Sequence, residues 1–106
     1  MSFQLRDDNG YVIPQIFDVG ATQVFTATTS SVQSTAFGAE TRFVRVAVSS
    51  GHCHVQIGAN PTASITTSVM MPNNWAEVFP CNPGDKIAVI KDSGVTTSVM
   101  SVTELV

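Results

Sequence analysis

The sequence predicts an all-β protein: an antiparallel β-sandwich, jelly-roll-like, with about eight short strands. Its composition favours strands, since valine occurs fifteen times and threonine twelve, whereas leucine occurs only twice. β-branched residues lose side-chain freedom in helices and pack well on a pleated sheet. No segment shows the apolar spacing of an amphipathic helix. Alternating apolar and polar residues, with turn residues at regular intervals, complete the pattern of a sandwich or barrel.

The expected strands are the segments in which apolar and polar residues alternate. They are residues 22–28, 31–37, 42–48, 53–57, 68–71, 75–79, 86–90 and 98–105. Turn-forming residues separate them, as in the stretches GANPT, MPNN, NPGD and KDSG. In NPGD, Pro83 fixes the first corner of a turn and Gly84 supplies a positive φ. We expect residues 21–106 to form one sandwich domain.

The first twenty residues differ from this pattern, and we expect an N-terminal extended arm or edge hairpin over residues 1–20. The Asp8–Gly10 stretch favours a turn, and Pro14 cannot donate a hydrogen bond to a central strand ladder. The segment is too apolar for a solvated tail. We therefore expect its large side chains to contact a neighbouring subunit: Phe3, Leu5, Tyr11, Ile13, Ile16 and Phe17.

The charge content limits the partners that this chain can have. Charged residues make up only 12% of the sequence, the net charge is -3, and the five Lys and Arg residues are scattered. Nucleic acids and anionic membrane surfaces are bound by dense cationic patches, so we expect neither as a partner. No apolar run approaches the roughly 20 residues that span a bilayer. A surface poor in charge instead favours a protein much of whose surface is covered by protein partners.

The stretch His52-Cys53-His54 raises the question of a metal or catalytic site. Alternation along a strand puts Cys53 on the core face, and it puts both histidines on the opposite face. A Cys–His catalytic pair within this stretch is therefore excluded. A His-x-His pair binds metal in jelly-roll enzymes of the cupin kind. This chain has no third histidine and no carboxylate shortly after His54, whereas zinc sites take three or four ligands. We expect no metal and no cofactor, and an exposed or interfacial pair of histidines.

Other reactive residues give no catalytic pattern. Cys53 and Cys81 are expected to be buried free thiols, with one bridge between them as the alternative. Trp75 is expected to anchor the core or an interface, with a sugar-binding platform as the alternative. The sequence has no nucleophile elbow, phosphate-binding loop or dinucleotide fingerprint. We therefore expect neither an enzymatic activity nor a small-molecule substrate.

Three stretches taken together resemble small proteins of tailed bacteriophages. They are RFVRVAVSSGHCHVQIGANPTAS, SVMMPNNWAEVFPCNPGDKIAVIKDSG and the terminal VTELV, within residues 42–106. The resemblance implies a virion component, namely a cement or decoration subunit on the capsid surface, assembled in the host bacterial cytoplasm. It implies as partners the major capsid protein and further copies of the chain, for example in a homotrimer. No functional residue carries over from it.

Three other functions stay open at this point. One is a tail, fibre or baseplate module of the phage particle, which could share this fold. Another is a small carbohydrate-binding β-sandwich that uses Trp75, Tyr11 or the Asn73-Asn74 loop. The third is a metal-dependent jelly-roll enzyme.

Overall fold

The computed structural model describes residues 5–6, 12–13 and 18–106. Its strands are β1 (Leu5–Arg6), β2 (Val12–Ile13), β3 (Val19–Thr26), β4 (Val32–Gln33), β5 (Phe43–Ser49), β6 (Cys53–Gly58), β7 (Val69–Met71), β8 (Trp75–Pro80), β9 (Lys86–Lys91) and β10 (Val99–Leu105). No helix long and apolar enough to cross a membrane occurs in the described residues. Strands β3 to β10 match the eight predicted segments one for one, so the predicted fold class is confirmed.

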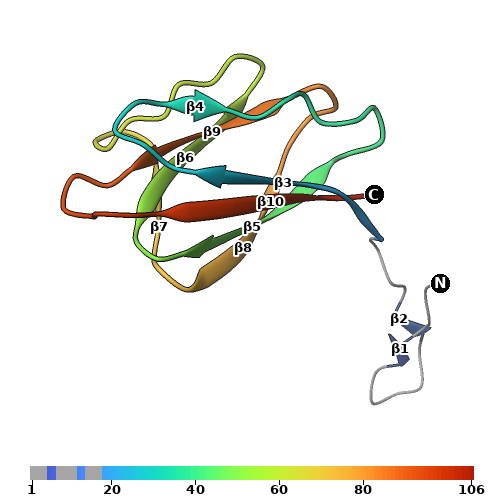
Figure 1. Cartoon of the computed structure of the whole chain (residues 1–106). Coiled ribbons are helices and arrows are strands. Elements are labelled where there is room, and N and C mark those ends of the chain that lie inside the picture. The colour runs from blue at the N-terminus through green and yellow to red at the C-terminus, as the bar shows by residue number, and fades with distance from the viewer. Residues whose placement is uncertain (1–4, 7–11, 14–17) are drawn as a thin grey trace.

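These eight strands form two antiparallel sheets that pack face to face (Figure 1). The first sheet has the order β3-β10-β5-β8, and the second sheet has the order β4-β9-β6-β7. Most connections cross from one sheet to the other, and each sheet combines strands that are far apart in the sequence. This strand order is that of a jelly roll, in which two Greek keys wrap around one core.

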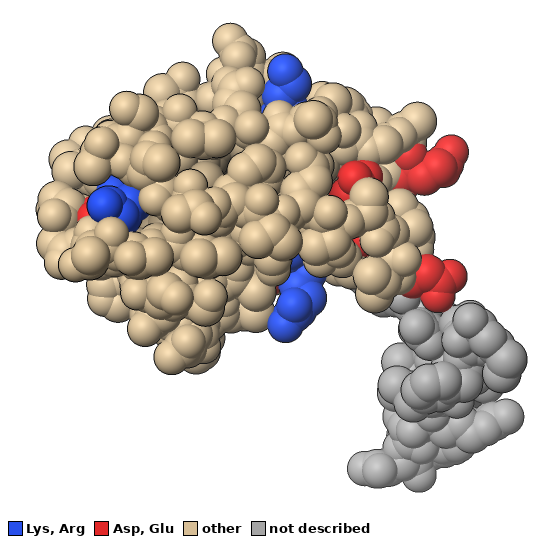
Figure 2. Space-filling model, viewed as in Figure 1, with Lys and Arg blue, Asp and Glu red and all other residues tan. Residues whose placement is uncertain are grey.

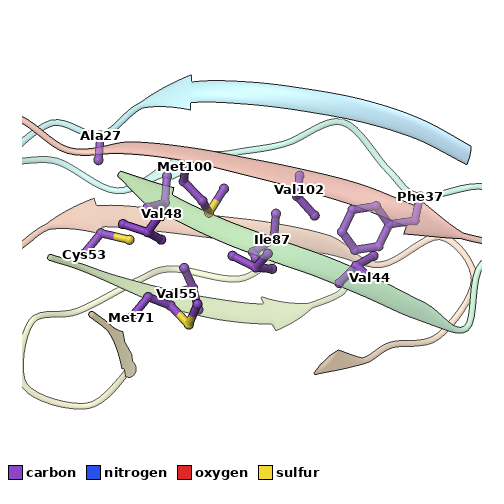
Figure 3. Close-up of a cluster of buried hydrophobic side chains, with 12 residues drawn as sticks. Ala27, Phe37, Val44, Val48, Cys53, Val55, Met71, Ile87, Met100 and Val102 are labelled. Atoms are coloured by element: carbon purple, nitrogen blue, oxygen red, sulfur yellow. The ribbon is translucent and has the colours of Figure 1, made fainter. Parts of the chain in front are cut away.

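The core lies between the sheets and follows from the alternation of side chains. In β10, Met100 and Val102 are fully buried, whereas the alternating residues Val99, Ser101 and Thr103 face outward. In β5, Val44, Val46 and Val48 point inward in the same way. Their side chains meet those of the second sheet, including Ile87, Val55 and Met71 (Figure 3). Each large apolar side chain that is fully buried contributes roughly 1.5–3 kcal/mol to stability.

The second sheet is covered on its outer face as well. Ala88 points outward from β9 and yet has no exposed surface. The segment 59–68, which joins β6 to β7, lies over this face. Gln33 Nε2 donates hydrogen bonds to Asn60 Oδ1 at 2.9 Å and to the Pro61 carbonyl oxygen at 2.6 Å. The amide of Ala63 donates to Ser31 Oγ at 2.9 Å. Residues 59–68 thereby form a fixed cover.

Two turns show why particular residues are needed where strands connect. Gly84 has φ of +82°, as predicted for the NPGD turn, and Asp85 N donates to the Asn82 carbonyl oxygen at 3.0 Å. Gly51 is buried between β5 and β6. A Cβ at Gly51 would overlap the Val95 side chain and the Thr97 carbonyl oxygen. Glycine is therefore required at Gly51 by close packing of the β9–β10 connection.

At the N-terminus, β1 and β2 pair with each other, with Leu5 opposite Ile13 and Arg6 opposite Val12. In Figure 1 they lie beyond the sandwich, on the side where β3 begins. The rest of the segment predicted as an arm or edge hairpin, residues 1–4, 7–11 and 14–17, lies outside the described residues. Asp18 and Val106 exchange two backbone hydrogen bonds, of 2.7 and 2.9 Å, next to the first residues of β3.

Both cysteines are free thiols, as predicted. Cys53 has no exposed surface, and burial raises the pKa of its thiol to about 11. Cys81 is half-buried, with its Sγ 3.8 Å from the Thr41 carbonyl oxygen. Burial raises the pKa of the Cys81 thiol, and the carboxylates of Asp85 and Glu104 raise it further. Neither thiol is placed or activated as a nucleophile.

We expect thiol reagents at pH 8 to label Cys81 before Cys53 in the folded protein. The thiolate is the reactive form, and Cys53 is both inaccessible and held as the neutral thiol. Mass spectrometry of the protein at successive labelling times measures this order, and denatured protein, in which both sites react, is the control. Labelling of Cys53 as fast as Cys81 would contradict the inward orientation of the β6 side chains.

Candidate functional site

The first sheet has an outer face that no described segment covers. Its outward-pointing residues form rows across the four strands, for example Val24, Ser101, Ala47 and Ala76. We call this surface the open face. It consists of Thr22, Val24, Thr26, Phe43, Arg45, Ala47, Ser49, Ala76, Val78, Val99, Ser101, Thr103 and Leu105.

The open face is almost uncharged, since Arg45 is its one ionisable residue. Val24 is 65% exposed and Val78 is 52% exposed, so apolar side chains stand in solvent there. Thr22 and Thr103 bond to each other through their hydroxyl oxygens at 2.9 Å. Figure 2 likewise shows a surface on which few charged side chains are visible. Surfaces that are poor in charge and expose apolar side chains are typical of contact with another protein.

Both outer strands of the first sheet have a free edge in the described part of the chain. Strand β3 pairs only with β10, and β8 pairs only with β5. Trp75 begins β8 and is 53% exposed, with its Nε1 donating to Glu77 Oε1 at 3.0 Å. Its position at a free edge fits the predicted interface anchor and leaves the alternative of a sugar platform open.

The two predicted histidines have different environments. His52 is exposed, and its Nδ1 accepts a hydrogen bond from the Asn73 amide at 3.1 Å. His54 is only 7% exposed, which differs from the expected exposed pair. It does point away from the core, as alternation predicted. The cover segment 59–68 and the β9–β10 connection bury it on the outer side of the second sheet.

His54 joins these two connections to β6. Its Nε2 lies 2.8 Å from Asp92 Oδ1, and its Nδ1 lies 3.3 Å from the Ser68 carbonyl oxygen. Both partners are acceptors, so only a ring that is protonated on both nitrogens can donate to both at once. The hydrogen bond from His54 holds the pKa of Asp92 below its usual value. The arrangement acts as a structural clamp between distant parts of the chain.

Glu104 is a second buried ionisable residue whose side chain has hydrogen-bond partners within the fold. It points inward at the end of β10, and its Oε1 accepts hydrogen bonds from the Gly38 amide at 2.8 Å and from Thr41 Oγ1 at 2.5 Å. The carboxylate thus fixes the turn before β5 against β10. Its hydrogen bonds are satisfied within the fold, which is typical of a structural carboxylate.

The described residues offer no three-ligand metal site, since nowhere in them do three His, Cys, Asp or Glu side chains gather. Four carboxylates on the described strands and turns each have a hydrogen-bond partner within the fold. Glu77 bonds to Trp75, Asp85 to the Asn82 amide, Asp92 to His54, and Glu104 to Gly38 and Thr41.

A small hollow opens between the two sheets at the side where β7 and β8 are the outer strands. Its volume is about 250 Å³, and it is lined by Val55, Gln56, Ile57, Val69, Phe79 and Pro80. Gln56 is the one polar side chain in this lining. The hollow is therefore suited to apolar groups, and it holds no acid, base or nucleophile.

The chain matches no protein-family model and no curated protein sequence. Its fold is similar to solved structures of hydroxypropylphosphonic acid epoxidase (HppE). The iron(II) form of HppE superposes with a TM-score of 0.53 at 10% identity, covering 95% of this chain and 54% of that chain. The enzyme from S. wedmorenis in complex with fosfomycin gives a TM-score of 0.53 at 10% identity, covering 92% of this chain and 60% of that chain.

This comparison corrects one expectation. We expected no enzymatic activity, but solved structures of an epoxidase share the fold over nearly the whole of this chain. The expectation was wrong because missing sequence motifs say little about a jelly roll, whose core residues carry no catalytic signature. At this identity the likeness shows the fold alone. The described residues do not fit a metal of the kind named for HppE, since they bring no three ligands together.

The predicted interface residues are only partly placed. Leu5 lies in β1 and Ile13 in β2, whereas Phe3, Tyr11, Ile16 and Phe17 lie outside the described residues. Sequence reasoning missed the open face. The signal was present in the outward positions of three predicted strands, 22–28, 42–48 and 98–105, which include Arg45 as their only cation.

We expect Asp92→Asn to lower the free energy of unfolding at neutral pH and to have a vanishing effect in acid. The pKa of Asp92 is lowered in the folded state, so its stabilisation is complete above the unfolded carboxyl value of about 3.9. It is lost as the pH falls through the lower folded pKa. Urea unfolding from pH 7 to pH 2 measures the difference, with exposed Glu40→Gln as the control. A difference that persists at the acid end would contradict stabilisation by the ionised Asp92 carboxylate.

We expect Glu104→Ala to destabilise the fold by about 1–3 kcal/mol, because the buried Thr41 hydroxyl loses its acceptor. The Gly38 amide also loses its acceptor, but Gly38 is exposed and water can replace the carboxylate there. Glu104→Gln keeps an accepting oxygen and should cost less. Urea denaturation of the three proteins gives the comparison. An alanine variant as stable as the wild type would show that water replaces the carboxylate.

Proposed function

We propose that this chain is a structural subunit of a tailed-bacteriophage particle, namely a cement or decoration protein of the capsid that acts in several copies. The observation that carries the proposal is the open face, a four-stranded surface with one charged residue. The resemblance of residues 42–106 to small phage proteins supports the same proposal. The fold comparison bears on architecture only.

The chemistry of the open face suits docking onto a protein shell. Its side chains are mainly Val, Thr, Ser and Ala, which lose little conformational freedom when they are covered. Interface centres are depleted in charge, as this face is. A cement subunit bound at many equivalent places gains stability through multiple simultaneous contacts, so each contact can be modest.

The remaining features agree with this proposal. A surface poor in Lys and Arg does not compete for the packaged nucleic acid. Two free thiols are compatible with assembly in a reducing bacterial cytoplasm, followed by a place on the virion surface. The proposed partners are the major capsid protein and further copies of this chain.

We expect Val24→Lys to weaken binding to phage heads that lack their own copy of this protein by about tenfold or more. The reason is that it buries a charge within the docked surface, at its β3 edge. Thr62→Lys, in the exposed cover segment over the second sheet, is the matched control and should bind normally. Cosedimentation with purified heads measures binding, and circular dichroism verifies folding.

Equal binding by Val24→Lys and the wild type would contradict docking through the open face. Electron microscopy of particles with bound protein gives the location. Density on the tail, fibre or baseplate instead of the head would favour the other phage role. Retention of the protein on a glycan array through Trp75 would favour the carbohydrate-binding role.

A further inference from the structure

We propose that the hollow between β6, β7 and β8 binds an extended apolar segment, residues 11–17 of a second copy of this chain. This deepens the proposed function by naming how copies are linked, and it rests on that function only for the existence of several copies. The site is distinct from the open face, because it lies at the edge between the sheets.

The hollow lies beside the part of β6 that has no partner strand on its β7 side. Strand β7 pairs with β6 only at Cys53–Val55, so Gln56–Gly58 have no strand partner on that side within the described residues. Across the hollow, Phe79 and Pro80 end the free edge of β8. Two unpaired backbone edges therefore flank an apolar recess. Unpaired edges of this kind take up an added strand from another chain.

The size of the hollow favours side chains over a cofactor. An apolar cavity of about 150 Å³ accommodates a benzene ring, and sites for drug-sized ligands measure about 300–1,000 Å³. The volume here, about 250 Å³, lies between these values. Val55 forms its floor and belongs to the core, while Val69 stands at the rim with 51% of its surface exposed. One large apolar side chain inserted there would extend the core outward.

The chain itself contains a segment with matching chemistry. Residues 11–17 read YVIPQIF, with no charge and with Gln15 as the one amide side chain. Pro14 holds the preceding residue extended, and an added edge strand needs backbone pairing on one side only, so it tolerates proline. The lining of the hollow is uncharged as well, so docking leaves no ionised group buried.

The occupant must come from another copy for Ile16 and Phe17 to reach the hollow. Strand β3 begins at Val19 on the far edge of the first sheet, with β10 and β5 between it and β8. Three strand spacings of about 4.8 Å separate the two edges by roughly 14 Å. Ile16 precedes Val19 by three residues, which span at most about 11 Å. Ile16 and Phe17 of the same chain therefore cannot extend from β3 across to the hollow beside β8.

The test is photocrosslinking of the full-length protein, without capsids, with p-benzoylphenylalanine in place of Val69 at the rim. Equal amounts of ¹⁴N- and ¹⁵N-labelled protein are mixed, so that mass spectrometry distinguishes cross-links between chains from those within one. We expect cross-links between chains that map to residues 11–17. The same probe in place of Val24, on the open face, is the positional control and should not reach that segment.

Two variants complete the test. Phe17→Glu should lower the yield from position 69 by about tenfold, whereas Phe17→Leu should retain most of it. Val24→Lys, the variant that tests capsid docking, should leave the cross-linking yield from position 69 unchanged. The two experiments therefore distinguish failure of the capsid-docking proposal from failure of this one. Cross-links within one chain only, none to residues 11–17, or a yield unaffected by Phe17→Glu would each overturn the proposal.

Discussion

The packing of two valine-rich inner faces is the constraint on which the rest of this structure depends. Val44, Val46 and Val102 of the first sheet meet Val55, Ile87 and Val89 of the second with almost no exposed surface. These side chains are short and stiff, so the sheets approach closely and each strand has one acceptable phase. A shift by one residue would turn every core side chain outward. The inward alternation therefore also determines what each outer face presents.

The two outer faces then differ because of what the connections do. The segment 59–68 crosses the second sheet, and hydrogen bonds with Gln33, Ser31 and His54 hold it there. No described segment crosses the first sheet, although its outer residues are as poor in charge as a covered surface would be. This difference makes the open face the natural place for a partner. The proposed docking of residues 11–17 into the hollow beside β7 would add a second, independent means of linking copies.

The likeness to an epoxidase illustrates how little a jelly roll by itself says about chemistry. The fold places short strands around a core, and the residues that line its interior decide what it does. Here the inward positions of β6 are Cys53, Val55 and Ile57, and the buried carboxylate Glu104 already binds Gly38 and Thr41. Within the described residues, no three potential metal ligands gather at these or any other positions. The comparison nevertheless removes the argument that such a fold excludes catalysis.

The sequence by itself determined the strands, their phase and the main turns. Alternation placed Cys53 and Val55 in the core, and Gly84 marked its turn, because these properties depend on neighbours only two or three residues away. Tertiary structure decided the burial of His54, the clamp to Asp92 and the carboxylate site of Glu104. His54 and Asp92 are 38 residues apart in the sequence, and Glu104 is 66 residues from Gly38. Which face is covered, and where an edge stays open, depends on the path of the connecting segments, and no local pattern of residues encodes that path.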